Sequence, residues 1–83
     1  MLTLIMFRSL TYAQRGARVL ERAGISATIA RAPQETTQRG CAYCVRIAGN
    51  RLHAALHVLE DNHIPFNSVF RQREDGGYQE VQL

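Results

Sequence analysis

The same order of structural patterns occurs twice in this sequence: a strand, a helix and another strand. In the first half, residues 2–7 and 26–32 have the composition of strands and flank an amphipathic segment. In the second half, residues 42–48 and 66–72 flank another such segment. Two βαβ-like halves of similar length predict a split βαβ, ferredoxin-like sandwich. We therefore expect an α+β fold in which a four-stranded antiparallel sheet carries two helices on one face.

Each amphipathic segment has the spacing of apolar residues that is typical of a helix. In the first segment, Ser9 is the predicted N-cap, and Gly24 is the predicted residue just after the C-terminal cap. In the second segment, Asn50 is the predicted cap, and the sequence NHIP ends the helix. The apolar stripes comprise Leu10, Ala13, Ala17, Leu20 and Ala23 in the first helix and Leu52, Ala55, Leu56 and Leu59 in the second.

The length of the chain, 83 residues, allows one domain. We assign residues 1–73 to a single ferredoxin-like domain and residues 74–83 to a polar C-terminal tail, which either adds a short edge strand or stays loose. The segment 2–7 is apolar on both faces, so it belongs in the middle of the sheet. The sheet face without helices then needs a partner, which favours a homodimer formed through that open face.

The charge of the chain gives only a weak indication of its partners. The net charge is +3, and all ten basic residues are Arg. Arg binds carboxylates, phosphates and other oxyanions with a planar fork of donors. The sequence contains no run of five basic residues and no aromatic motif for single-stranded RNA, so we predict no nucleic-acid partner.

The sequence also predicts a cytoplasmic protein that does not enter a membrane. The apolar segment 2–7 has no basic region before it and no cleavage site of small residues after it. No apolar stretch approaches the length that spans a bilayer. In a reducing compartment, two cysteines usually stay thiols or serve redox, metal or transfer chemistry.

Both cysteines of the chain lie in the segment TQRGCAYCVRI, residues 37–47. Cys41 stands at the end of a polar segment, residues 33–40, which has no periodicity and is predicted as a loop; it directly follows Gly40 and lies two residues after Arg39. Nearby positive charge lowers the pKa of a thiol, and backbone N–H groups around a glycine can bind an anion. We therefore interpret Cys41 as a candidate reactive thiol whose anion is stabilised by Arg39, Gly40 and Arg46. The alternative is a small, semi-buried residue without chemistry.

Cys44 lies in the strand that we predict over residues 42–48, where Cys44 and Arg46 are expected on one face and Tyr43, Val45 and Ile47 on the other. On a regular strand Cys41 and Cys44 point to opposite faces, so a disulfide between them would need a turn at Ala42 and Tyr43. Cys44 is therefore either a resolving thiol, which makes it the second candidate catalytic residue, or a residue of the sheet. The pattern favours the sheet residue.

His53 and His57 are four residues apart and share one face of the second predicted helix. With the two cysteines they form the pattern C-x2-C-x8-H-x3-H, which is similar to a zinc-finger ligand set. The middle spacer is shorter than the usual length of about twelve residues. The two histidines also lie beside the apolar stripe, as on a solvated flank. We predict no metal site and no cofactor, with a zinc-binding module as the alternative.

Several features occur in an order that characterises a known family. They are Phe7 and Ser9, the helix residues Ala13, Ala17 and Leu20, the pair Gly24 and Ile25, and then Pro33, Thr36, Thr37 and Cys41. Residues 3–73 thereby resemble the selenium/sulfur carrier protein-like family of small bacterial domains. Three features depart from the family pattern: Gln34 replaces an Arg, the polar segment before the cysteine is longer, and Ala42 replaces a Gly. Cys44 is an addition to the pattern.

The resemblance implies a carrier or acceptor of reduced sulfur or selenium. Cys41 would accept the atom as a persulfide or perselenide and pass it on, with a cysteine desulfurase or a sulfurtransferase-like protein as partner. We accordingly expect a carrier or accessory protein rather than a stand-alone enzyme. The alternative is a regulatory or protein-interaction module without catalysis, because small ferredoxin-like sandwiches also serve in that role.

Overall fold

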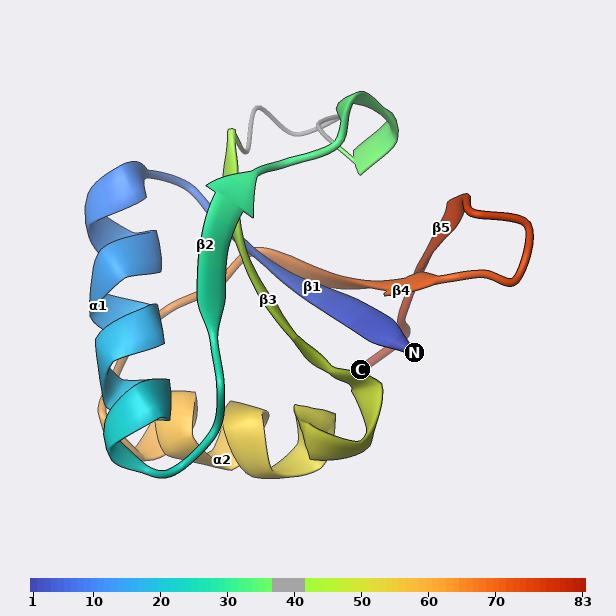
Figure 1. Cartoon of the computed structure of the whole chain (residues 1–83). Coiled ribbons are helices and arrows are strands. Elements are labelled where there is room, and N and C mark those ends of the chain that lie inside the picture. The colour runs from blue at the N-terminus through green and yellow to red at the C-terminus, as the bar shows by residue number, and fades with distance from the viewer. Residues whose placement is uncertain (37–41) are drawn as a thin grey trace.

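The computed structural model describes residues 1–36 and 42–83 of the chain. Within these residues it contains two α-helices and one sheet of five strands (Figure 1). The strands are β1 (Leu2–Phe7), β2 (Thr28–Arg31), β3 (Tyr43–Ala48), β4 (Ser68–Gln72) and β5 (Tyr78–Glu80), the helices are α1 (Leu10–Arg22) and α2 (Leu52–Asp61), and two short 3₁₀ turns are η1 (Gln34–Thr36) and η2 (Gly49–Arg51). Neither described helix is long and apolar enough to cross a membrane.

The strand order in the sheet is β2-β3-β1-β4-β5, and every neighbouring pair is antiparallel. The predicted α+β class and the interior position of β1 are confirmed, but the predicted number of four strands is wrong. Part of the expected tail forms β5, which pairs with β4 from Gln72↔Tyr78 to Phe70↔Glu80. The fold is therefore close to the ferredoxin-like sandwich that we predicted, without being identical to it.

A tight turn brings β5 back beside β4. The carboxylate of Asp75 accepts a hydrogen bond from the backbone N–H of Gly77 (2.9 Å) and one from the side chain of Arg73 (3.3 Å). Gly76 has a φ of +89°, a left-handed conformation that glycine adopts without steric strain. Of the two expectations for the tail, the short edge strand is the one that the structure shows. The sequence did not decide between them, because the strand is three residues long and lies in a polar segment without a run of apolar residues.

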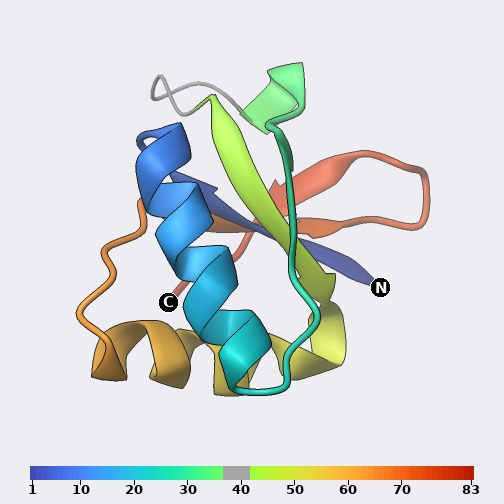
Figure 2. The ribbon, with the colours of Figure 1, turned by 60° about the vertical axis from the view of Figure 1, so that its left-hand side comes forward.

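Both helices cover the same face of the sheet (Figure 2). Ile5 and Phe7 of β1 are fully buried there, together with Leu20 of α1 and Leu59 of α2. Gly16 lets α1 approach the sheet closely, since a Cβ atom at this position would lie 2.7 Å from Cζ of Phe7. The apolar faces that the sequence predicted for the strands and the helices thus meet in one core.

Local signals define the two ends of α1 as predicted. The side chain of Ser9 accepts a hydrogen bond from the backbone N–H of Tyr12 (3.3 Å). At the other end, the N–H of Ile25 donates to the carbonyl of Leu20 (2.9 Å), a bond of the Schellman motif. Gly24 has the φ of +84° that this motif requires.

The start of α2 differs from the prediction. Its N-cap residue is Arg51, no side chain caps it, and Asn50 lies within η2, so the assignment of Asn50 as the cap is wrong. The backbone explains the shift, because the N–H of Gly49 donates to the carbonyl of Met1 (2.6 Å) and ties this turn to the start of β1. The first turn after β3 is therefore a 3₁₀ turn, and the α-helix begins after it.

The face of the sheet without helices, which we call the non-helical face, is partly covered within the chain. Leu4, Met6 and Cys44 are each at most 1% exposed there. Phe70 and Tyr78, from the two strands of the β4–β5 hairpin, pack against them. The hairpin thus covers apolar surface that we expected a second copy to bury, and the homodimer through this face stays a prediction.

Candidate functional site

The candidate site lies where the chain leaves β2 and re-enters the sheet at β3. Three of the predicted site residues, Arg39, Gly40 and Cys41, lie outside the described residues. The described chain on either side is joined, because the N–H of Ala32 donates to the carbonyl of Ala42 (2.9 Å). Ala42, the residue that follows Cys41 in the sequence, therefore extends the β2–β3 ladder by one position.

The segment between β2 and residue 36 contains a short turn, η1. The carbonyl of Pro33 accepts a hydrogen bond from the N–H of Thr36 (2.9 Å) and another from its hydroxyl (2.7 Å). Thr36 is 4% exposed, so its polar side chain is buried with its hydrogen bond satisfied. We predicted a loop without regular structure over residues 33–40, and the first part of it forms η1 instead.

Arg31 and Tyr43 form a pair at this end of the sheet that the sequence analysis missed. They face each other in the β2–β3 register, and Cζ of Arg31 lies 5.9 Å from the centre of the Tyr43 ring. This distance is within the range of a cation–π interaction. Prediction of this pair would have required the β2–β3 register. The sequence does not give that register, because a long loop joins the two strands.

Cys44 is the free thiol that the structure describes, and it is buried. It lies between Met6 of β1 and Ala30 of β2 in the sheet register. Burial raises the pKa of this thiol, and the charge of Arg46 opposes the rise only in part. The environment therefore favours the protonated thiol, which is the less nucleophilic form.

Cys44 and Arg46 line the same cavity on the non-helical face. We call it the Arg46 cavity; its volume is about 380 Å³. The other lining residues include Leu4, Pro33, Gln72 and Tyr78. The predicted alternation of β3 is thereby confirmed, because the intervening residue Val45 belongs to the core under the helices.

The two histidines of α2 lie on the other side of the sheet from Cys44. His53 and His57 are exposed, and their ring centres are 5.6 Å apart. Cys44 is buried on the non-helical face, whereas α2 covers the opposite face. The sheet thus separates Cys44 from the histidines, and residues 1–36 and 42–83 contain no group of three or more His, Cys, Asp or Glu side chains placed to hold a metal ion.

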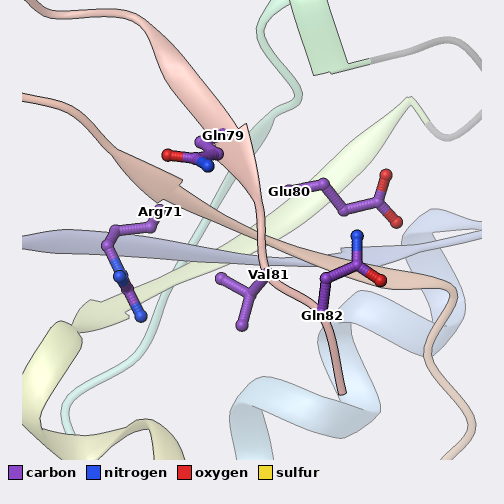
Figure 3. A pocket seen from close by; sticks show the side chains of 5 residues that line it. All are labelled: Arg71, Gln79, Glu80, Val81 and Gln82. Carbon is purple, nitrogen blue, oxygen red and sulfur yellow. The ribbon is translucent and has the colours of Figure 1, made fainter.

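A second cavity, of about 280 Å³, lies beside the C-terminal strand. Its lining residues are Arg71, Gln79, Glu80, Val81 and Gln82 (Figure 3). In Figure 3 the side chains of Arg71 and Glu80 lie on opposite sides of the strand and do not converge. None of the five residues is a thiol or an imidazole, so this cavity brings together no group from the predicted site.

These observations define a small α+β domain with a buried thiol, that of Cys44, in its sheet. Residues 3–71 match the protein-family model described as "Putative Se/S carrier protein-like", so the chain belongs to this family. The resemblance that the sequence motifs predicted is confirmed. The match begins in β1 and ends in β4, so β5 lies beyond it. Comparisons with curated proteins and with solved structures gave no match.

Proposed function

We propose that this protein carries reduced sulfur or selenium and that Cys41 is the residue that carries it. The observation on which the proposal depends is the match of residues 3–71 to the carrier family. The contrast between the two cysteines supports the choice of residue. Burial favours the protonated thiol at Cys44, whereas Cys41 follows a polar segment that includes Arg39.

In the proposed transfer, the thiolate of Cys41 attacks the outer sulfur of a persulfide on a donor protein. The new S–S bond to Cys41 forms as the S–S bond of the donor breaks, and the donor leaves as a thiolate. Cys41 then carries the persulfide and passes its terminal sulfur to an acceptor by the same exchange. The exchange needs no external oxidant or reductant, because one thiolate and one persulfide replace another such pair. Selenium would follow the same route as a perselenide.

Positive charge near Cys41 supports the proposed thiolate and the persulfide anion. We assign this role to Arg39 and to the backbone around Gly40, and we add Arg31 because it lies at the end of the sheet from which the chain leads to Cys41. From the sequence, we assigned the same role to Arg46. Within the described residues, the charge of Arg46 lowers the pKa of Cys44. The proposed donor is a cysteine desulfurase or a sulfurtransferase-like protein.

Intact-protein mass spectrometry tests the proposal directly. The wild-type protein, Cys41→Ser and Cys44→Ser would each be incubated with a cysteine desulfurase and cysteine, and in parallel with the desulfurase and selenocysteine, so that the donor itself carries the persulfide or perselenide. We expect an added sulfur or selenium atom on the wild type and on Cys44→Ser, and none on Cys41→Ser. Cys44→Ser is the matched control, because it replaces the sulfur of the other thiol with the same hydroxyl oxygen.

Two outcomes would contradict the proposal. An adduct that survives in Cys41→Ser and disappears in Cys44→Ser would assign the transfer to the buried thiol. The absence of an adduct on all three proteins, with folding unchanged by circular dichroism, would favour the alternative of an interaction module. In that case a variant without both thiols would keep its partner binding.

A further inference from the structure

The Arg46 cavity contains a cation, Arg46, that the transfer at Cys41 does not use. The described lining residues include no Asp or Glu. Arg31 also lines the cavity, but its guanidinium lies over the ring of Tyr43, which packs with the helix-side core. No ion pair joins Arg46 to a carboxylate in the parts of the chain that the structure describes. An unpaired guanidinium beside a concave surface attracts anions and can bind two oxygen atoms at once.

The lining of the Arg46 cavity combines two kinds of group. Arg46, Gln72 and Tyr78 bring side chains that can donate hydrogen bonds to oxygen atoms. Leu4 and Cys44, each 1% exposed, bring a hydrocarbon and a polarizable sulfur. The cavity therefore suits an anion that has both oxygen atoms and a soft atom.

We propose that the Arg46 cavity binds a small chalcogen oxyanion of the thiosulfate type, with Arg46 as its charged ligand. A volume of about 380 Å³ is near the lower end for small-molecule sites, which are typically about 300 to 1,000 Å³. The oxygen atoms contact Arg46, and the terminal sulfur points to Leu4 and Cys44. The choice of a chalcogen anion rests on the proposed carrier function, and no bond is made or broken in this binding step.

Titration of the ¹⁵N-labelled protein with thiosulfate, followed by NMR, tests this inference. We expect saturable shifts of the backbone signals of Cys44, Arg46 and Tyr78. Loss of a charge-assisted hydrogen bond weakens binding by about tenfold or more, so Arg46→Gln should raise the dissociation constant by at least that factor. Arg18→Gln removes the same charge from the exposed side of α1 and should leave the dissociation constant unchanged.

Sulfate serves as the matched ligand, because it has the same charge and an oxygen atom in place of the terminal sulfur. We expect sulfate to bind several-fold more weakly than thiosulfate, and equal binding of the two anions would overturn the preference for a chalcogen. Equal affinities for thiosulfate in the wild type and Arg46→Gln would overturn the site itself. The site would also be overturned if the NMR shifts increased with thiosulfate without saturation and affected the backbone signals of all arginines.

The same titration of Cys41→Ser separates this inference from the proposed function. This variant cannot carry sulfur on Cys41, but its Arg46 cavity is intact, so we expect unchanged thiosulfate binding. If sulfur loading of Cys41 failed and the binding persisted, the carrier proposal would fail and the binding site would stand. If loading succeeded and no binding occurred, the carrier would stand and the site would fail.

Discussion

On the helix side of the sheet, the buried residues come from two helices, three strands and the segments that follow the two helices, and they form one continuous core. On the non-helical face, the buried cluster is Leu4, Met6 and Cys44, with the hairpin side chains Phe70 and Tyr78 packed against it. The first face contains only apolar side chains at its centre. The second contains a thiol, and an arginine and a cavity lie beside it.

This difference separates the residues that stabilise the fold from those that are available for chemistry. Gly16 and Phe7 illustrate the first group, because they are so close that no Cβ atom fits between α1 and β1. Arg46 illustrates the second, because it is exposed in the middle of a strand and has no ion pair with the described residues. Substitutions that change one face at a time test this separation.

The largest expected effect is the loss of a leucine from the helix-side core. Leu20→Ala should lower the free energy of unfolding by about 3 kcal/mol, because truncation of a buried leucine leaves a cavity that the structure fills only partly. Leu4→Ala should cost less, about 2 kcal/mol, because Leu4 already borders the Arg46 cavity. Urea denaturation of the two variants would measure both values. Equal costs would mean that the two faces are packed alike.

A smaller loss of stability is expected from Gly16→Ala. The new Cβ atom would lie 2.7 Å from Cζ of Phe7, so α1 must move away from the sheet or the ring must shift. Overpacking of this kind typically costs about 1 to 3 kcal/mol, which exceeds the gain in helix propensity of about 1 kcal/mol. Thermal denaturation would show a lower melting temperature. The exposed position Gln14 is the control, and Gln14→Ala should change stability by less than about 0.5 kcal/mol. A melting temperature for Gly16→Ala at or above that of the wild type would contradict the close approach.

Much of the helix side could be predicted from the sequence, because its signals are local. Ser9 and Gly24 mark the ends of α1 by their own chemistry, and apolar spacing marks the face that is buried. The failures have physical reasons as well. Asn50 is a good cap residue in isolation, but the contact of Gly49 with Met1 imposes a 3₁₀ turn. Residues 78–80 carry no apolar pattern, so the sequence could not decide whether the tail adds an edge strand, as β5 does, or stays loose.

The candidate site could be predicted only in part. Alternation along β3 correctly placed Cys44 and Arg46 on one face. The Arg46 cavity itself is formed by residues from distant parts of the chain, among them Pro33 and Gln72, which meet only because of the strand order. No local sequence pattern predicts that these residues lie together. The roles proposed for Cys41, Arg39 and Gly40 stay predictions from the sequence.

The buried thiol of Cys44 should make stability depend on alkaline pH. Burial raises the pKa of Cys44 above its ordinary value of 9.0, so the folded state retains a proton that the unfolded state releases. Its contribution is therefore complete below about pH 9 and is lost as the pH rises toward the folded-state pKa. Cys44→Ala should remove this part of the decline in unfolding free energy between pH 8 and about pH 10.5, a range bracketing the ordinary Cys pKa. Identical pH profiles for the wild type and Cys44→Ala, measured by denaturation, would show that the thiol is solvated.

The smallest effect on stability is expected for Arg46→Gln, and this variant separates the two faces most sharply. Because Arg46 is exposed and has no ion pair with the described residues, the free energy of unfolding at pH 7 should change by less than about 0.5 kcal/mol. Its charge lowers the pKa of Cys44 against the effect of burial, so its removal should raise that pKa further. In a Cys41→Ser background, where Cys44 is the remaining thiol, the ultraviolet absorbance of its thiolate should then appear at a higher pH in Arg46→Gln. An unchanged absorbance profile would mean that Arg46 does not act on Cys44. A large loss of stability would place Arg46 with the residues that hold the fold, and the non-helical face would then resemble the helix side.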